Sequence, residues 1–316
     1  MFHFLLTEPI HEEGVKILQA EGNVRLAKGT DEETLIAELQ DIDGVILRAR
    51  GRMTRRVLES APRLKVIGRH GVGVDNVDLE AATELGIQVV NTPHAVTEGV
   101  VEHTVGLMLD VAKRITYADR RLRAGDWEVR YRLSGRELRG RTLGVIGFGR
   151  IGRRVAQTCF YGFGMQILYT DVVSAPDLEQ ALGARRLALD DLLRTAEFIT
   201  LHVPLLPETR HLLGEREFRL MRRDAILINC ARGAVIDEKA LYRALTEGWI
   251  AGAGIDVFEE EPTPADNPLL GLENLVATPH TATATEEALL NMALVAKDVV
   301  RVLKGEPPEY PVNTIR

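Results

Sequence analysis

The stretch Thr142-Leu143-Gly144-Val145-Ile146-Gly147-Phe148-Gly149-Arg150-Ile151-Gly152 decides the fold of this chain. Its apolar first half predicts a short buried strand, and a helix-compatible segment follows the glycines through Gln157. A second strand, Met165–Thr170, then ends at Asp171. Strand, glycine turn, helix, strand and acid in this order are the context that a dinucleotide-binding fingerprint requires. The alternative is a glycine-rich turn in some other α/β unit.

The glycines of this turn allow the backbone to approach a pyrophosphate, whose charge then lies at the N-terminus of the following helix. The residues predicted to contact the cofactor here are Gly147, Phe148, Gly149, Arg150, Ile151 and Gly152. Asp171 can accept hydrogen bonds from a ribose 2′-hydroxyl, whereas its charge would repel a 2′-phosphate. Val172 and Val173 offer no arginine to compensate. The sequence therefore predicts NAD rather than NADP.

Size and composition exclude several classes of protein. The 316 residues are enough for two domains, and 45% hydrophobic with 27% charged residues is ordinary for a globular chain. A net charge of −7 argues against nucleic-acid binding. No apolar run reaches the roughly 18 residues of a membrane span, and Met1–Glu8 resembles a first strand rather than a signal peptide. Two cysteines in no CxxC spacing, Cys159 and Cys230, favour a reducing cytoplasm.

Strand-like and helical segments alternate along the first ninety residues. One helix is expected from a capping box formed by Thr30 and Glu33. The expected strands are Phe2–Leu6, Val24–Ala27, Gly44–Leu47, Lys65–Gly68 and Ile87–Val90. Such alternation predicts a parallel, doubly wound sheet, complete before the glycine fingerprint begins.

The remainder of the chain predicts a second sheet and a returning helix. A long helix is expected over residues 97–123, and a last helix from the capping-box pair Thr283 and Glu286 to about Lys304, before a strand-forming tail. Because that helix needs a surface to cover, we expect a discontinuous substrate domain of residues 1–94 and 283–316. The fold predicted is α/β with two doubly wound parallel-sheet domains, a Rossmann NAD domain (95–282) inserted into a flavodoxin-like substrate domain.

Three segments carry reactive side chains just after predicted strands, where α/β sheets place their ligands. Arg232 can present a rigid fork to a carboxylate, although a structural ion pair is an equal alternative. Glu261 ends an acidic run, in which Glu259 and Glu260 are interpreted as surface charges. His280 follows a strand and precedes a helix, and taken alone such a histidine is more often structural.

Together these segments resemble the D-isomer-specific 2-hydroxyacid dehydrogenases, close to the phosphoglycerate dehydrogenase branch, over the whole chain. The motifs that carry the resemblance are Gly71–Asp78, Asn91-Thr92-Pro93, Val101–Thr104, the fingerprint, Leu201–Pro204, Asn229–Gly233, Asp256–Phe258 with Glu261-Pro262, and Thr278-Pro279-His280. The chain departs from the family pattern after His280, where Thr281-Ala282 replaces a small residue and glycine. This puts substrate choice in doubt more than the chemistry.

The resemblance implies a catalytic set of Arg232, Glu261 and His280. Arg232 would bind the substrate carboxylate, His280 would move a proton at the C2 oxygen, and Glu261 would orient the imidazole and favour its protonated form. Asp256 would lie near the nicotinamide amide, and His202, Val203 and Pro204 would line the adenosine side. The further cofactor contacts implied are Thr97, Cys230, Ala231 and His280.

The resemblance also implies substrate contacts from Arg48, Arg69, Val72, Gly73 and Arg232. Two arginines would suit a doubly anionic acid, with 3-phosphoglycerate/3-phosphohydroxypyruvate as the first expectation and hydroxypyruvate, glyoxylate or a related 2-keto acid as the alternative. A binding protein similar to NAD-sensing corepressors is a third. We also expect no metal, no membrane or nucleic-acid partner, no regulatory extension, and a homodimer built through the region 97–141.

Overall fold

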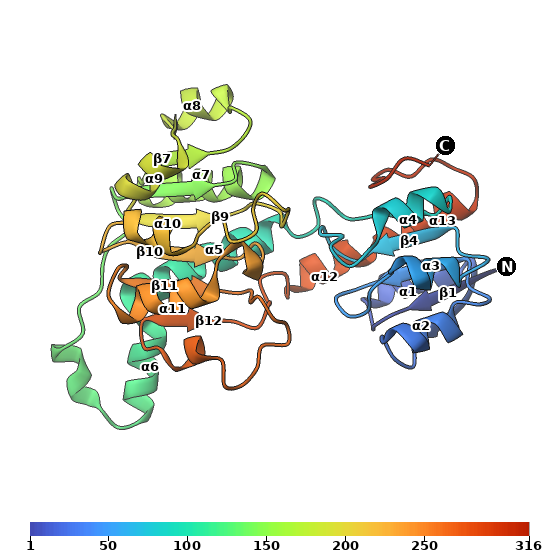
Figure 1. Ribbon diagram of the computed structural model, residues 1–316, viewed down its shortest axis with the longest axis horizontal. Helices are drawn as coiled ribbons and strands as arrows, with labels where there is room; N and C mark the ends of the chain where they lie inside the picture. Colours follow the sequence, from blue (N-terminus) through green and yellow to red (C-terminus); the bar gives the residue numbers. More distant parts are fainter. Residues whose placement is uncertain (316) are drawn as a thin grey trace. The chain divides into compact units, whose positions relative to one another are not determined.

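The computed structural model describes residues 1–315 and contains two compact units (Figure 1). The first comprises Met1–Val96 with the segment from Thr283 onward, and the second comprises Thr97–Ala282. Both are parallel α/β units, as the fold prediction required. No helix within residues 1–315 combines the length and the apolar character needed to cross a membrane.

The first unit contains a five-stranded parallel sheet in the order β2-β1-β3-β4-β5. Its strands are β1 (Phe2–Leu6), β2 (Gly22–Leu26), β3 (Gly44–Leu47), β4 (Val66–Arg69) and β5 (Gln88–Val90). Its helices are α1 (Glu12–Gln19), α2 (Glu32–Glu38), α3 (Arg55–Glu59), α4 (Leu79–Glu84), α12 (Glu286–Ala293) and α13 (Val295–Leu303). Successive strand residues alternate between two cores: Phe4 packs with Val299 of α13, whereas Leu5 packs with Leu35 of α2. The returning C-terminal helix therefore completes one face of this sheet.

The second unit contains a seven-stranded parallel sheet in the order β12-β11-β10-β9-β6-β7-β8. Its strands are β6 (Thr142–Ile146), β7 (Gln166–Thr170), β8 (Arg185–Arg186), β9 (Phe198–Leu201), β10 (Ile226–Asn229), β11 (Gly252–Ile255) and β12 (Leu275–Ala277). The helices α5 (Thr97–Lys113) and α7 (Arg150–Phe163) pack against each other. The remaining helical elements are α6 (Ile115–Arg123), η1 (Trp127–Tyr131), α8 (Pro176–Leu182), α9 (Leu189–Thr195), α10 (Glu215–Leu220), η2 (Gly233–Val235), α11 (Glu238–Thr246) and η3 (Pro268–Gly271).

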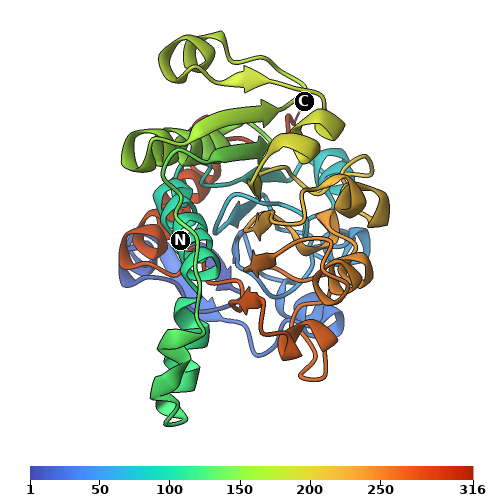
Figure 2. The same cartoon turned by 90° about the vertical axis from the view of Figure 1, so that its left-hand side faces the viewer.

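The structure corrects four predicted helix features. The long helix predicted over 97–123 is two helices, because Arg114 has a left-handed backbone (φ 57°) and interrupts it. Figure 2 shows α6 and the following segment (green) extending away from the sheet of the second unit. The last helix is likewise two helices, α12 and α13. The two predicted capping boxes are wrong: Asp31 caps α2 and Thr285 caps α12, each accepting a bond from the backbone N–H three residues ahead.

Candidate active site

The turn between β6 and α7 is built by close backbone approach. Gly147 has φ +91°, and a Cβ on Gly152 would lie 2.1 Å from the Gly147 carbonyl oxygen. His202 and Val203, at the end of β9, lie against Gly147, so the structure brings these predicted cofactor residues to the turn. Any side chain at Gly147 or Gly152 would have to displace backbone, which explains the glycines at these two positions.

The same turn has the properties that a dinucleotide needs. Gly149, the N-cap residue of α7, provides no side-chain cap, and a Cβ placed on it would meet nothing within 4 Å. Backbone N–H groups at a helix N-terminus beside open space suit a pyrophosphate. Outside this turn, the buried hydroxyl of Thr97, the first residue of α5, has no hydrogen-bond partner among the described residues. These residues fit the group that the fingerprint predicts.

Asp171 lies at the end of β7, directly beside the turn. Its Oδ2 accepts a hydrogen bond from the Phe148 backbone N–H at 2.5 Å and its Oδ1 accepts one from Val173 at 3.0 Å. Val172 and Val173, which follow Asp171 in the sequence, are not arginines, but Arg186 of β8 donates to the carbonyl oxygens of Asp171 (2.7 Å) and Val172 (3.2 Å). No motif signals this arginine, because β8 is only two residues long and both are charged.

The predicted catalytic residues come together at the carboxyl ends of β10, β11 and β12. His280 Nδ1 lies 2.7 Å from Glu261 Oε2, and Glu261 Oε1 accepts a bond from the Phe258 N–H at 3.1 Å. Burial by itself would raise the pKa of Glu261, but its bond to His280, the charge of His280, the Phe258 N–H and the charge of Arg232 lower it below the usual value. Arg232 is therefore near enough to act on this carboxylate.

Backbone and neighbouring side chains hold Arg232 in position. Its Nη1 donates to the Ala231 carbonyl oxygen at 2.7 Å, and the Asn229 side chain binds both the Arg232 carbonyl (3.0 Å) and the Ala231 N–H (3.0 Å).

Cys230 is buried, and burial raises the pKa of its thiol to about 12, so it is no thiolate nucleophile.

Asp256 has more partners than the sequence indicated. It is fully buried at the end of β11, and its carboxylate accepts bonds from Thr278, Thr281 and Ala282, which flank His280. The predicted contact between Asp256 and the nicotinamide stays a prediction. The bonds to the His280 segment could not have been read from the motifs.

The predicted substrate residues Arg48, Arg69, Val72 and Gly73 lie in the first unit. Arg48 directly follows β3, and Arg69 is the last residue of the adjacent strand β4. Leu47, the last residue of β3, pairs with Arg69. Arg48 Nη1 donates to the Pro9 carbonyl oxygen at 2.8 Å, and Arg69 donates to the carbonyl of His70. His70 was not predicted as a site residue. It is buried, and burial, together with the charges of Arg48 and Arg69, lowers its pKa to about 4.

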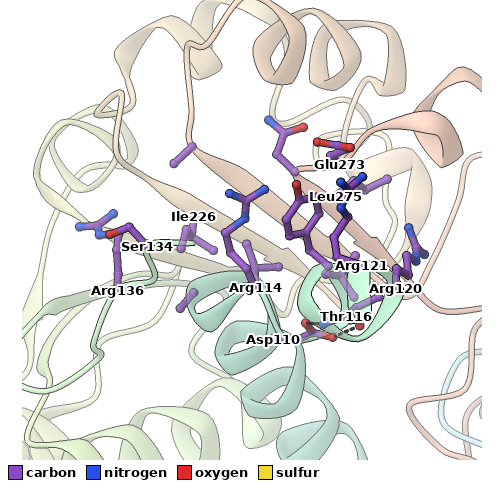
Figure 3. Close-up of a pocket in the computed structure, with 16 residues that line it drawn as sticks. Asp110, Arg114, Thr116, Arg120, Arg121, Ser134, Arg136, Ile226, Glu273 and Leu275 are labelled. Carbon is purple, nitrogen blue, oxygen red and sulfur yellow. Dashed lines mark hydrogen bonds between the residues drawn. The ribbon is translucent and has the colours of Figure 1, made fainter. Parts of the chain in front are cut away.

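A cavity of about 370 Å³ lies in the second unit (Figure 3). Ile226 and Leu275, the first residues of β10 and β12, line it, so it lies at the amino ends of the strands. Arg114, Arg120 and Arg121 surround it, with Asp110 bonded to Thr116. None of the predicted site residues is among the described residues that line this cavity.

Comparisons with known proteins identify the family. Residues 105–282 match the family model described as "D-isomer specific 2-hydroxyacid dehydrogenase, NAD binding domain". The chain belongs to the D-isomer specific 2-hydroxyacid dehydrogenases, a family of NAD-dependent oxidoreductases, and NAD is its cofactor.

The chain is similar to relatives with different named activities. The chain is 48% identical to D-3-phosphoglycerate dehydrogenase of Methanocaldococcus jannaschii over 99% of its own length, but it spans only 60% of that relative. It is 42% identical to glyoxylate reductase of Korarchaeum cryptofilum, covering 98% of this chain and 95% of the relative. Among solved structures, D-lactate dehydrogenase of Aquifex aeolicus, complexed with NAD and lactic acid, has a TM-score of 0.86 at 33% identity, covering 96% of each chain.

Proposed function

We propose that this chain interconverts a 2-keto acid and a D-2-hydroxy acid, with His280 as the acid/base, Glu261 as its orienting partner and Arg232 as the carboxylate-binding group. The observation that carries this proposal is the 2.7 Å contact between His280 Nδ1 and Glu261 Oε2. When bound, NAD supplies the hydride acceptor or donor at its nicotinamide ring.

The proton moves through His280. A carboxylate only accepts hydrogen bonds, so the 2.7 Å contact requires a proton on Nδ1 and leaves Nε2 as the nitrogen that can serve a substrate. The Glu261 carboxylate stabilises the imidazolium when Nε2 is protonated. Nε2 can then donate a proton to the C2 oxygen during reduction and accept it back during oxidation.

Arg232 is suited to bind the substrate's carboxylate. Guanidinium is always charged and can make two parallel hydrogen bonds to one carboxylate. Its backbone is fixed by Asn229, so the fork is presented from a rigid strand end. A carboxylate bound there would hold the neighbouring C2 carbon beside His280. The reacting groups would then already be close together and correctly oriented, which lowers the barrier to the reaction.

We propose that the acid carries a second negative charge, as 3-phosphohydroxypyruvate does. Arg48 and Arg69 lie at adjacent strand ends, and together they act on His70 strongly enough to help keep it neutral. A substrate with two negative charges could pair with the guanidinium groups of these two arginines. Sequence identity to D-3-phosphoglycerate dehydrogenase supports this reading, whereas the nearly full-length match to glyoxylate reductase favours a small acid such as glyoxylate as the second candidate.

A substrate panel separates these candidates. NADH oxidation is followed at 340 nm with 3-phosphohydroxypyruvate, hydroxypyruvate and glyoxylate, for the wild type and for Arg48→Gln and Arg69→Gln. We expect each variant to raise KM about tenfold for the phosphorylated acid and little for glyoxylate. Equal KM changes for all three acids would remove the phosphate role. Tight NADH binding with no turnover of any acid would favour a binding protein instead.

The catalytic assignment is tested by His280→Asn. Loss of the acid/base should lower kcat by a factor of about 100 to 10,000 while the Kd for NADH, measured by fluorescence, stays within about twofold. Glu261→Gln is the matched variant and should give a smaller loss, because the oxygen of the new amide can still accept a bond from Nδ1. Wild-type turnover in His280→Asn would refute the proposed role.

We also propose that the chain acts as a homodimer in the cytoplasm. Ile115, Leu122, Trp127 and Tyr131 of α6 and η1 are large apolar side chains left exposed in the region predicted to form the interface. The two cysteines are unpaired and buried, as suits a reducing compartment. Light scattering at micromolar concentration measures the mass, and a monomer would contradict the dimer.

A further inference from the structure

The Asp256 carboxylate holds the backbone on both sides of His280. Its Oδ1 accepts bonds from the Thr278 hydroxyl at 2.6 Å and the Thr281 N–H at 2.8 Å, and its Oδ2 accepts one from the Ala282 N–H at 2.9 Å. The Asp256 carbonyl oxygen also accepts the His280 N–H at 2.7 Å. One residue, directly after the last residue of β11, therefore holds the whole turn that carries His280.

This turn needs external support because His280 has a left-handed backbone, with φ +53°. Residues with a Cβ seldom adopt that conformation unless their surroundings impose it. If the turn relaxed, the imidazole would leave the position from which Nδ1 reaches Glu261. The conformation of His280 is thus linked to the bonds that Asp256 makes.

His103 of α5 makes the contact that completes this network. Its Nε2 lies 2.9 Å from Thr278 Oγ1 and 3.4 Å from Asp256 Oδ1. The Thr278 hydroxyl has one hydrogen and gives it to Asp256, so the Thr278 oxygen must accept its bond from His103. His103 therefore carries a proton on Nε2, which points at both partners.

The packing of α5 brings His103 to this point. A Cβ on Gly254 of β11 would lie 3.0 Å from the Leu107 Cβ of α5, so the helix lies unusually close to the strand. Leu107 is one helical turn after His103, on the same helix face. The glycine in β11 thus allows a side chain of α5 to reach the strand's carboxyl end.

The charge of Asp256 depends on these bonds. Burial alone would raise the pKa of this carboxyl group, but the bonds from His103, Thr278, Thr281 and Ala282 lower it below the usual value. Asp256 is therefore ionised at neutral pH, and charge-assisted bonds to an ionised carboxylate are stronger than neutral ones.

We propose that His103 is a positioning residue for the dehydrogenase reaction: by donating to Thr278 and Asp256 it holds the turn that aims His280 at Glu261. The inference rests on the proposed role of His280. His103 itself needs no contact with substrate or cofactor, and its effect passes through Thr278 and Asp256.

The test compares His103→Leu, which removes the donor, with His103→Gln, whose amide nitrogen can replace Nε2–H. Glu102→Gln, at the exposed neighbouring position on α5, is the control. Rates are measured with NADH and either 3-phosphohydroxypyruvate or glyoxylate. We expect kcat and kcat/KM of His103→Leu to fall together by about tenfold, with the NADH Kd within about twofold, and His103→Gln to recover to within about threefold of wild type.

The measured turnover of these variants decides whether the positioning role holds. Wild-type turnover in His103→Leu overturns the positioning role, as does an equal loss in His103→Leu and His103→Gln. If His103→Leu does not fold, Thr278→Val and Thr278→Ser replace the pair, and only the serine variant should retain turnover. His280→Asn is assayed in parallel: if its turnover is wild type, the proposed function fails and this inference with it, whereas if His280→Asn is inactive and His103→Leu is normal, only the inference fails.

Discussion

The two units share a parallel sheet covered by helices, but the turns after their first strands differ in chemistry. In the first unit, β1 leads to α1 through a turn whose last residue, His11, accepts the Glu13 N–H at 3.2 Å, and Glu12 and Glu13 occupy the first helical turn. In the second unit, β6 leads to α7 through Gly147–Gly149, with no side-chain cap and no acid in the first turn. The N-terminus of α1 is therefore unfavourable for an anion because it is capped and carries two acids, whereas the N-terminus of α7 can bind one.

Among the substitutions that test this difference between the two turns, Gly152→Ala should have the largest effect. The added Cβ would lie 2.1 Å from the Gly147 carbonyl oxygen, so the turn must move and the unfolding free energy should drop by about 3 kcal/mol. Gly149→Ala is the matched variant, because its Cβ meets nothing within 4 Å. We expect it to keep its stability but to weaken NADH binding at least about tenfold, since a methyl group then occupies the approach to the helix. Denaturant unfolding and NADH fluorescence measure the two effects, and equal stabilities would contradict the steric argument.

The histidines at the carboxyl ends of the two sheets provide a second contrast. His280 is half-exposed and paired with Glu261, whereas His70 is buried, its Nε2 has no hydrogen-bond partner among the described residues, and its pKa is lowered to about 4. The unfolded chain binds this proton near its ordinary pKa, at higher pH than the folded chain does. Stability therefore falls as pH drops below about 6.5, by about 2 kcal/mol between pH 7 and pH 5 from His70 alone.

His70→Gln should remove that contribution. Its unfolding free energy, measured against pH, should decline less steeply than that of the wild type over this range. Parallel curves for the two proteins would show that His70 does not take up a proton on unfolding.

The smallest expected effect concerns cofactor choice in the second unit. Asp171→Asn should shift the ratio of the NADPH and NADH Kd values about tenfold toward NADPH, because it removes a charge that repels a 2′-phosphate. Arg186, which binds the backbone beside Asp171, should contribute, so the double variant with Arg186→Gln should shift less. An unchanged ratio in Asp171→Asn would overturn the assignment.

The sequence predicted the architecture well because burial leaves strong patterns. The strands Phe2–Leu6 and Gly44–Leu47 have the expected bounds, since apolar runs between turn residues permit few alternatives. Helix interruptions were not predictable at Arg114 or Leu294, where neither glycine nor proline marks the break. The capping positions were misplaced by one or two residues because Thr30 and Asp31, like Thr283 and Thr285, are both good caps.

The candidate site was predictable as a set of residues but not as a set of contacts. Motifs identified Glu261 and His280, and the structure gives them the 2.7 Å contact on which the proposed chemistry depends. The contacts of His103 with Thr278 and Asp256 depend on how α5 packs, and the bond from Arg186 to the Asp171 carbonyl depends on how β8 packs. Such packing leaves no periodic signal in the sequence.

The β6–α7 turn also changes what kind of mutation should harm this protein. The turn depends on two positions that have no Cβ atom. A Cβ at Gly152 would clash with the Gly147 carbonyl oxygen, and a Cβ at Gly149 would occupy the open space beside the helix N-terminus. Losing a functional group is the usual route to an inactive enzyme, but here we expect the gain of a single methyl group to be enough. Deep mutational scanning should therefore find these glycines intolerant even of alanine, the mildest replacement available elsewhere in the chain.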